Sequence, residues 1–441
     1  MTRLSNVAAA CVCAFIAAAS AAAPCEPVLI ETPEAAVLRG DPTGVRVVGL
    51  EPGSDVTITA ERTWGRNPAK VYRAAATFRA DRDGEIELDR DAPIDAAWAG
   101  VDPFGLFWSA EPTDEPVPEG RSSSQIDLAM DIDGDGIADA RASLISVRAR
   151  DDLVRTELAP DFPGAFLLRP PGEEPLAVVI VLGGSEGNAW TAENTAPKLA
   201  SRGYAVVGLP YYSPAYGGGE PDIPGLPTAF HNIRVDLLEE VLAAMRARPD
   251  IDAERAALYG VSKGAEFVLL GASLIDRFDA VIAYVPTDVV WEGWGPGTTA
   301  GQSSSFSWRG EPVSFVPYKG MAAEIAKYGS GEQPRIRTPH DAGRAAFPDT
   351  VAEARIRVEA IDAPVLVVGG DMDDVWDSGG MARAIATARE RAGKPTIAII
   401  SEDAGHQLSG DGCTPAPAAE GAVRSRAFRA ALDLLEQTIG Q

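Results

Sequence analysis

A serine lies between two glycines in the sequence Gly-Val-Ser-Lys-Gly at 260–264. A short apolar stretch at 255–259 precedes it and predicts a buried strand, and an Ala- and Leu-rich stretch at 265–275 follows with helical spacing. A Gly-x-Ser-x-Gly sequence between a strand and a helix is typical of a nucleophile elbow, where a strained turn lifts the hydroxyl clear of the backbone. A glycine- and serine-rich loop without chemistry is the alternative. The strand–turn–helix context favours Ser262 as a nucleophile.

Serine alone is a weak nucleophile near neutral pH, so it needs a base within hydrogen-bond reach and a third group that orients the base. The chain has three histidines, His231, His340 and His406. Around such an elbow the order along the chain is Ser, acid, His, and the base follows the last strand. His406 comes just after a predicted strand at 396–400, so we predict that it is the base. The other two histidines are predicted to lie in surface loops.

The acid is predicted in a loop at 369–374 that directly follows an apolar strand. This loop holds three aspartates. Asp373 is favoured because it lies three residues past the second glycine, which is the usual spacing of the acid in folds that carry such an elbow. The alternatives are Asp371 and Asp374 in the same loop, and Asp288 after an earlier strand.

The negative charge that forms on the attacked carbonyl oxygen needs two backbone N–H donors. One is predicted to come from Lys263, the residue after the nucleophile. The other is predicted in a glycine-rich turn at 183–187, after an apolar strand at 177–182, with Ser185 or Glu186 as the donor. A turn that binds a pyrophosphate is a weaker alternative, because the G-x-G-x-x-G spacing and its acidic partner are absent from the sequence.

Strands and helices alternate between about residue 156 and the last residue, 441. The strands, such as 177–182, are continuously apolar, as expected for a parallel sheet covered by helices on both faces. We therefore predict an α/β-hydrolase domain over 156–441. An amphipathic stretch at 233–246 is predicted to be one of its helices. A region at about 288–355, rich in Gly, Pro and Trp, interrupts the alternation and is predicted to cover the site as a lid.

Residues 24–155 have a different pattern. Short alternating runs at 45–48, 55–59 and 74–78 are separated by turn signals rich in Gly, Pro, Asp and Ser. Short strands at this spacing predict an all-β, immunoglobulin-like sandwich domain in front of the α/β domain.

Four carboxylates within this domain have the spacing of the first part of a calcium loop. They occupy relative positions 1, 3, 5 and 9, with glycine at position 6, and are Asp131, Asp133, Asp135 and Asp139. Position 12 is Ala142, so the bidentate acid of such a loop is absent from the sequence. A hairpin turn between two strands is an equally weighted alternative. The serine mechanism itself requires no metal or organic cofactor.

Acidic residues outnumber basic ones by 64 to 39, which gives a formal net charge of −25. This charge argues against nucleic acid and anionic membrane surfaces as partners and favours a small-molecule substrate. Residues 1–23 have a basic Arg3, an apolar run at 7–19 and an Ala-x-Ala cleavage site, which together predict export to the periplasm or beyond the cell. No later apolar run has the length of a membrane span.

Two cysteines, Cys25 and Cys413, follow the predicted export segment. One pair in an oxidising compartment predicts a disulfide that ties the mature N-terminus to the C-terminal domain. Two unpaired thiols are the alternative, since the separation of the two residues cannot be judged from sequence.

Several segments together resemble one family. The elbow at 260–266 resembles that of the acyl-CoA thioesterase and bile acid-CoA:amino acid N-acyltransferase family. The segments 48–53 and 100–109 are similar to the β-sandwich domain of that family, and 404–406 resembles its base loop. The resemblance covers nearly the whole mature chain in the same order.

The resemblance also bears on the acid and on the reaction. In the acid loop of the family two adjacent acids precede a Trp by four and three positions; Trp376 aligns them with Met372 and Asp373, which supports Asp373. The family implies hydrolysis of acyl-CoA thioesters or transfer of the acyl group to an amino acid. Members that transfer tend to carry Cys at the elbow, so Ser262 indicates hydrolysis. The alternatives are an exported carboxylesterase, acyltransferase or peptidase-like hydrolase acting on a substrate without CoA, and a binding protein without catalysis.

Overall fold

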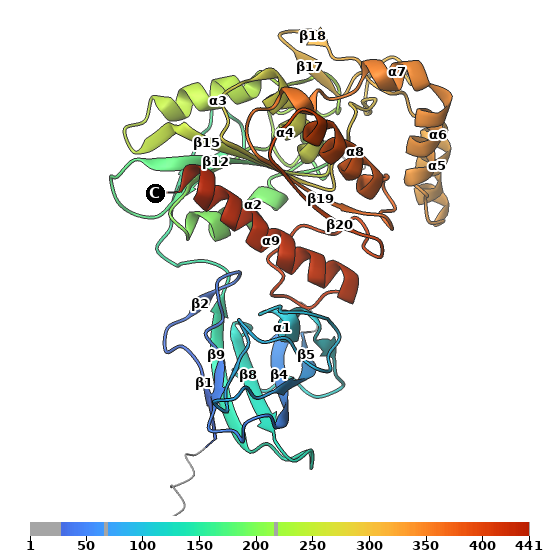
Figure 1. Cartoon of the computed structure of the whole chain (residues 1–441). Coiled ribbons are helices and arrows are strands. Elements are labelled where there is room, and N and C mark those ends of the chain that lie inside the picture. Colours follow the sequence, from blue (N-terminus) through green and yellow to red (C-terminus); the bar gives the residue numbers. More distant parts are fainter. Residues whose placement is uncertain (1–27, 66–68, 216–218, 441) are drawn as a thin grey trace, which may run out of the picture.

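The computed structural model describes residues 28–65, 69–215 and 219–440. Figure 1 shows a β-rich domain at the N-terminal end and a larger α/β domain above it. The predicted combination of a β-rich domain followed by an α/β-hydrolase domain is therefore confirmed. The predicted export segment, 1–23, lies outside the described residues.

The β-rich domain consists of two sheets around one hydrophobic core. The larger sheet has the order β2 (Val37–Leu38), β9 (Ala140–Val147), β8 (Gln125–Asp131), β4 (Asp55–Trp64), β5 (Lys70–Arg79) and β7 (Glu111–Pro112). The smaller sheet has the order β1 (Leu29–Glu31), β3 (Arg46–Val48) and β6 (Ile86–Glu87). In β4, Val56, Ile58 and Ala60 are buried in this core. Because side chains alternate across a strand, the period-two pattern of the sequence selects the inward face.

An eight-stranded sheet forms the centre of the α/β domain. Its order is β10 (Val154–Glu157), β11 (Phe166–Arg169), β13 (Ala205–Gly208), β12 (Leu176–Leu182), β15 (Ile251–Val261), β16 (Ala280–Tyr284), β19 (Val365–Gly370) and β20 (Thr396–Ser401). The pairs β10–β11 and β11–β13 are antiparallel, and all neighbours from β13 to β20 are parallel. The carboxyl ends of the parallel strands therefore meet at one edge, where ligands bind in such sheets.

Helices cover both faces of this sheet. One face packs against α3 (Leu237–Arg246), α4 (Lys263–Leu274) and α8 (Ser378–Arg391). The opposite face packs against α2 (Trp190–Ala200) and α9 (Ala418–Ile439). In β12, Val178 and Ile180 belong to the first core and Val179 and Val181 to the second. This double burial explains why the strand is continuously apolar in sequence.

The chain between β16 and β19 departs from the alternation of strands and helices. It holds β17 (Phe306–Trp308), β18 (Glu311–Pro312), α5 (Met321–Ser330), α6 (Arg337–Ala346), α7 (Pro348–Glu353) and the 3-10 turn η2 (Val358–Ala360). The strand β17 pairs with β14 (Ile233–Arg234). The helix predicted over 233–246 therefore begins only at Leu237, because the residues before it are extended in this small sheet. The helices α5 and α6 lie at the right-hand edge of Figure 1.

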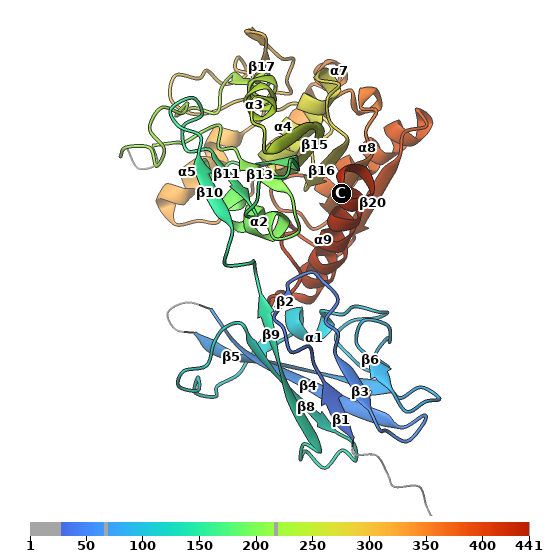
Figure 2. The ribbon, with the colours of Figure 1, turned by 90° about the vertical axis from the view of Figure 1, so that its left-hand side faces the viewer.

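The start of α9 packs on the β-rich domain beside α1 (Gly105–Trp108). The buried Trp108 donates its indole N–H to Asp102 at 3.0 Å, and the Ser425 hydroxyl donates to the other oxygen of Asp102 at 2.6 Å. A Cβ on Gly421 would lie 2.4 Å from the Trp108 ring, so only glycine allows this approach. Figures 1 and 2 both place this end of α9 against α1. The segment 100–109 thus forms part of the contact between the domains.

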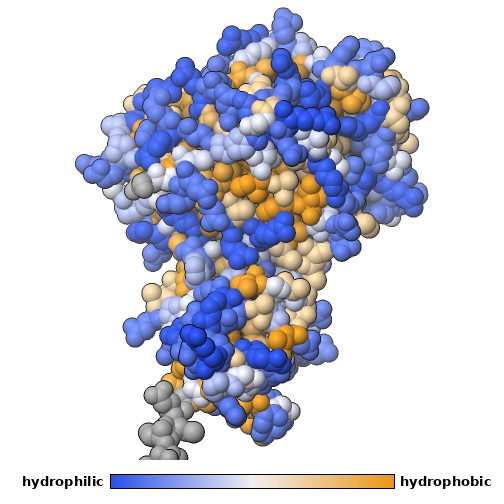
Figure 3. Space-filling view, viewed as in Figure 1, coloured by the Kyte–Doolittle hydropathy of each residue, from blue (hydrophilic) through white to orange (hydrophobic). Residues whose placement is uncertain are grey.

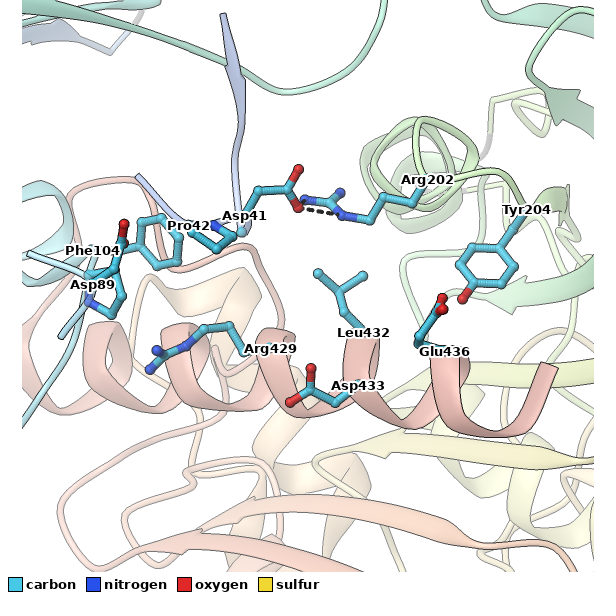
Figure 4. Close-up of a pocket in the computed structure, with 12 residues that line it drawn as sticks. Asp41, Pro42, Asp89, Phe104, Arg202, Tyr204, Arg429, Leu432, Asp433 and Glu436 are labelled. Carbon is cyan, nitrogen blue, oxygen red and sulfur yellow. Dashed lines mark hydrogen bonds and ion pairs between the residues drawn. The ribbon is translucent and has the colours of Figure 1, made fainter. Parts of the chain in front are cut away.

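A second contact between the domains surrounds a cavity of about 430 Å³. Figure 4 shows Arg202, which follows α2, pointing toward Asp41 of the β-rich domain. The guanidinium of Arg202 donates to one Asp41 oxygen at 2.6 and 2.9 Å. The acidic side chains Asp433 and Glu436 of α9 line the same cavity. The charge of Arg202 is therefore already neutralised within the protein.

Hydrophilic side chains cover most of the face shown in Figure 3, with hydrophobic ones gathered in patches over the α/β domain. Within the described ranges, every helix is too short or too polar to cross a membrane.

Candidate active site

The turn between β15 and α4 has the geometry of a nucleophile elbow. Ser262 lies between the two elements with φ of 57° and ψ of −120°, a left-handed conformation that is rare for a residue with a side chain. A Cβ on Gly260 would lie 2.2 Å from the carbonyl oxygen of Gly264, and one on Gly264 would lie 2.3 Å from the carbonyl oxygen of Gly183. Both glycines of the motif are therefore required by the packing of the turn.

A continuous chain of hydrogen bonds joins the three residues predicted for the triad. The Oγ of Ser262 lies 3.1 Å from Nε2 of His406, and Nδ1 of His406 lies 2.8 Å from an Asp373 carboxylate oxygen. Ser262 follows β15, Asp373 follows β19 and His406 follows β20. Their side chains meet because these parallel strands end at the same edge of the sheet. Residues more than 100 positions apart in the chain are thus placed within hydrogen-bond reach.

The environment of Asp373 keeps this carboxyl ionised. The residue is 1% exposed, and burial alone would raise its pKa, but the hydrogen bond and the charge of His406, together with hydrogen bonds from Ser378 and the Val375 N–H, outweigh burial and lower the pKa below its usual value. The Trp376 N–H donates to the same carboxylate at 3.2 Å. A buried carboxylate at Nδ1 fixes the tautomer in which Nδ1 carries the proton. The Nε2 atom that faces Ser262 is then free to accept one.

The alternative acids have other partners. Asp371 accepts two hydrogen bonds from Arg383, at 2.6 and 2.8 Å, and Asp288 accepts two from Arg344, at 2.6 and 3.2 Å. Asp374 is exposed. The geometry therefore singles out Asp373 among the four aspartates considered from the sequence.

The predicted oxyanion donors lie on both sides of the nucleophile. Lys263 is the first residue of α4, and the first N–H groups of a helix have no partner within it, so its N–H is available to a ligand. Across from it, a Cβ on Gly184 would lie 3.0 Å from the Cβ of Ser262. The loop with Ser185 and Glu186 therefore runs directly beside the nucleophile. Which of these two residues donates the second N–H stays a prediction.

The Lys263 side chain forms a buried network that was not predicted from the sequence. Its Nζ lies 2.6 Å from a Glu266 oxygen and 3.0 Å from the hydroxyl of Ser305, and the other Glu266 oxygen accepts the N–H of Trp291 at 3.0 Å. Burial lowers the pKa of Lys263 and raises that of Glu266. Three aromatic rings also lie 5.0 to 5.6 Å from Nζ: Phe230, Trp294 and Phe306. The network connects the elbow to the region after β16. Its only sequence signal is a Lys and a Glu three residues apart in an otherwise apolar helix.

The prediction that His340 lies in a surface loop is wrong. It is 2% exposed in α6, and its ring packs edge-on against Trp291, Tyr318 and Trp376 at 4.6 to 5.6 Å between ring centroids. Burial lowers its pKa to about 4, so the ring is neutral near neutral pH. Trp376 in turn packs against His406 at 5.3 Å. The reason for the error is that α6 folds back onto the aromatic cluster beside the triad.

The aspartate loop between β8 and β9 brings together three of its four predicted ligands. Carboxylate oxygens of Asp131, Asp133 and Asp139 lie within 4.8 Å of one another, whereas Asp135 does not belong to this group and accepts the N–H of Ile137. The carboxylates also accept backbone N–H groups of their own turn, as a hairpin requires. Calcium binding stays a prediction.

Cys413 lies buried in the core shared with the β-rich domain. Its carbonyl oxygen accepts a hydrogen bond from Arg62 of that domain at 2.6 Å. Cys25 lies outside the described residues, so the predicted disulfide stays a prediction. The segment around Cys413, which follows His406 in the chain, is thus attached to the β-rich domain by its backbone.

Comparisons with known proteins place both domains in one family. The model for the acyl-CoA thioester hydrolase/BAAT N-terminal region matches residues 40–132, and the model for the BAAT/acyl-CoA thioester hydrolase C terminal matches residues 233–420. The chain belongs to the acyl-CoA thioester hydrolase and BAAT family. The second match spans all three residues of the hydrogen-bonded chain. The dienelactone hydrolase family model also matches, over residues 164–295.

Relatives in this family are moderately similar in sequence. Acyl-coenzyme A thioesterase 1 of Rattus norvegicus is 25% identical over 376 residues, which cover 83% of this chain and 82% of the relative. Acyl-coenzyme A thioesterase 6 of Homo sapiens is 30% identical over 250 residues, which cover 55% of this chain and 56% of the relative. Among solved structures, an esterase of Pyrococcus furiosus aligns with a TM-score of 0.40 and 14% identity over 63% of this chain and 88% of its own. The family matches and the thioesterase relatives make the chain a hydrolase of the acyl-CoA thioester hydrolase family.

Proposed function

We propose that the protein hydrolyses acyl-CoA thioesters through Ser262, His406 and Asp373. The observation that carries this proposal is the unbroken hydrogen-bond chain from the Ser262 hydroxyl to the buried Asp373 carboxylate. His406 Nε2 takes the hydroxyl proton as Ser262 Oγ attacks the thioester carbonyl carbon. The N–H of Lys263 and one from the loop at 183–187 stabilise the oxygen on which negative charge develops.

The first half of the reaction ends with departure of the thiol, and the second half releases the acyl group. His406 protonates the departing thiolate, which leaves the acyl group on Ser262 as an ester. A water molecule then loses a proton to Nε2 as its oxygen attacks the ester carbonyl carbon. The bond from that carbon to Ser262 Oγ breaks, Nε2 returns the proton to Oγ, and the carboxylic acid is released. The ionised Asp373 stabilises the imidazolium that forms in both halves.

Membership of the family, and its similarity to acyl-coenzyme A thioesterases, support a CoA thioester as the substrate. The serine at the elbow supports hydrolysis over transfer to an amino acid. A carboxylesterase, acyltransferase or peptidase-like hydrolase on a substrate without CoA is the alternative, and it would use the same three residues. A side-by-side assay with palmitoyl-CoA and p-nitrophenyl esters separates the two: the proposal requires the higher kcat/KM for the thioester.

Replacement of the nucleophile tests the mechanism. We expect Ser262→Ala to lower kcat by about 10⁴-fold or more and to abolish labelling by a fluorophosphonate probe. The matched control is Ser273→Ala at the far end of α4, where the hydroxyl donates only to the Leu270 carbonyl oxygen. Equal activity of the two variants would rule out Ser262 as the nucleophile. Absence of labelling in the unmodified protein would favour a binding protein.

Export belongs to the same proposal, because the apolar segment at 1–23 has the pattern of a cleavable signal. Expression of the full chain in a bacterial host, followed by cell fractionation and N-terminal sequencing, tests it. A mature protein that starts near residue 24 in the periplasm or medium is the expected result, and an intact cytoplasmic chain would contradict it.

A further inference from the structure

A cavity of about 740 Å³ lies between the two domains, on the side where the chain leaves His406. The β-rich domain contributes Arg39 and Trp64, α2 contributes Trp190 and Lys198, and α9 contributes Arg424. This volume lies within the roughly 300–1,000 Å³ that is typical of small-molecule sites. The catalytic residues described above do not line this cavity, so the reaction at Ser262 does not explain it.

The cavity is basic in a strongly acidic protein. Four cationic side chains line it, Arg39, Arg148, Lys198 and Arg424, against a single carboxylate, Asp411. Over the whole chain acidic residues outnumber basic ones by 64 to 39. The cavity thus has the opposite charge to the protein as a whole. Its cationic side chains repel one another, and an anionic ligand would relieve this repulsion.

Most of this positive charge is unpaired. Asp411 pairs with Lys198 at 3.1 Å, whereas Arg39, Arg148 and Arg424 form no ion pair with any residue of the described ranges. Arg39 is only 7% exposed, and its Nε has no hydrogen-bond partner within those ranges. Buried guanidinium groups normally have their N–H donors satisfied. Three arginines without carboxylate partners therefore point to phosphate groups, whose oxygens match the guanidinium fork.

Aromatic rings accompany the arginines. The Trp64 ring is held beside the guanidinium groups of Arg39 and Arg62, at 5.4 and 4.9 Å from the ring centroid. Trp190, the first residue of α2, is 65% exposed although it lines the cavity. An exposed indole at a basic cavity is suited to stacking on a flat heterocycle. The first turn of α2 also carries the positive end of the helix dipole, which favours an anion there.

Two residues that line the cavity are hydrogen-bonded to segments beside the triad. The Nε of Arg424 donates to the carbonyl oxygen of Gln407, the residue next to His406, at 2.7 Å. Thr191 lines the cavity and donates to Glu186 in the loop beside Ser262 at 2.5 Å. A ligand in the cavity would therefore be separated by one side chain, Arg424, from the segment that holds His406. It would be separated by another, Thr191, from the loop at 183–187.

The other cavity between the domains provides a contrast (Figure 4). It measures about 430 Å³, its Arg202 is neutralised by Asp41, and three further carboxylates line it: Asp89, Asp433 and Glu436. It has neither the excess of positive charge nor an exposed indole. A cavity between the domains is thus not basic by default.

We infer that the 740 Å³ cavity binds the phosphorylated nucleotide end of the thiol leaving group. This inference rests on the proposed thioesterase function, and it assigns the phosphates to Arg39, Arg148 and Arg424 and the adenine ring to Trp190. The pantetheine arm then runs from this cavity to the thioester at Ser262. Specificity for CoA thioesters over simple esters arises from both domains, because Arg39 belongs to the β-rich domain.

The kinetic test uses single variants of exposed lining residues in the full chain, Arg148→Gln and Trp190→Ala. The substrates carry one acyl chain on CoA, on 3′-dephospho-CoA and on pantetheine. We expect each variant to lower the ratio of kcat/KM for the CoA thioester to that for the pantetheine thioester by about tenfold, through KM. The matched control is Arg429→Gln in the other cavity, which should leave the ratio unchanged. A ratio unaltered by both lining variants would overturn the inference.

A binding test separates this inference from the proposed reaction. Calorimetric titration of Ser262→Ala with CoA, pantetheine and adenosine 3′,5′-bisphosphate measures affinity without turnover. We expect CoA and the bisphosphate to bind and to lose about tenfold in affinity in the background of Arg148→Gln, and pantetheine to bind weakly. Nucleotide binding without thioesterase activity would sink the proposed function alone, whereas equal affinity for CoA and pantetheine would sink the cavity assignment alone.

Discussion

The Nζ of Lys263 lies 2.6 Å from a carboxylate oxygen of Glu266, and their side chains are only 2% and 0% exposed. The pair lies directly behind the nucleophile, since Lys263 is also the residue that offers its N–H to the oxyanion. Glu266 holds the backbone of Trp291 on its other oxygen. The geometry of the elbow is therefore linked to the region after β16 through one buried ion pair.

Removal of one partner of this pair should destabilise the protein strongly. Glu266→Gln leaves the Lys263 ammonium buried without a counter-ion, and we expect a loss of about 3–5 kcal/mol in the free energy of unfolding. The control is Glu254→Gln, whose partner Arg246 lies 2.7 Å away at the exposed surface, where the loss should be about 0–1 kcal/mol. Denaturant unfolding measures both. A loss for Glu266→Gln no larger than that of the control would show that the buried pair contributes little.

The role of Asp373 can be separated from that of its neighbour Asp371. Asp373→Asn keeps the shape of the side chain but favours the wrong tautomer of His406, and we expect kcat to fall by about 10⁴-fold. Asp371→Asn, which loses only its partner Arg383, should alter kcat by less than about twofold. If Asp371→Asn were the more damaging change, the assignment of the acid would be wrong.

Much of this site follows from sequence because strand ends are easy to locate in an α/β domain. Asp373 and His406 each follow a strongly apolar strand, so the shared edge of a parallel sheet predicts that they meet. The partners of Lys263 could not be predicted, since Ser305 and Trp291 come from the insertion at about 288–355. The apolar residues of that insertion have no helical or strand periodicity from which its fold could be predicted. His340 was misplaced for the same reason. Which aspartates of the loop between β8 and β9 lie close together also depends on the geometry of the turn, which the spacing of the residues in the sequence does not determine.

The buried His340 predicts a pH dependence of stability. Its pKa is about 4 in the folded state, whereas an unfolded histidine titrates near 6.5. Between these values the unfolded chain binds the extra proton, so stability from this group is lost as the pH falls from about 6.5 to about 4, by about 3 kcal/mol in total. The melting temperature of His340→Asn should therefore fall less over this range. Parallel curves for His340→Asn and the unmodified protein would contradict the prediction.

Replacement of glycine by alanine should have opposite effects at two positions, one closely packed at the elbow and one open in α5. Gly264→Ala would place a methyl group 2.3 Å from the carbonyl oxygen of Gly183, and we expect loss of activity and of at least about 2 kcal/mol of stability. Gly329→Ala in α5 meets nothing within 4 Å and should stabilise the protein by about 0.5–1 kcal/mol through better helix propensity. Thermal melting and activity assays check both, and a tolerated Gly264→Ala would mean that the turn can relax.

The bond from Arg62 to the carbonyl oxygen of Cys413 has a consequence for biosynthesis. Cys413 lies seven positions after the imidazole that acts as the base, so the tail of the base loop is anchored on a module that leaves the ribosome first. Domains fold in order of synthesis, so that module is already assembled when the last strand emerges. The segment around Cys413 can then pack against the folded β-rich domain. An α/β half produced alone would have to arrange its base without this template.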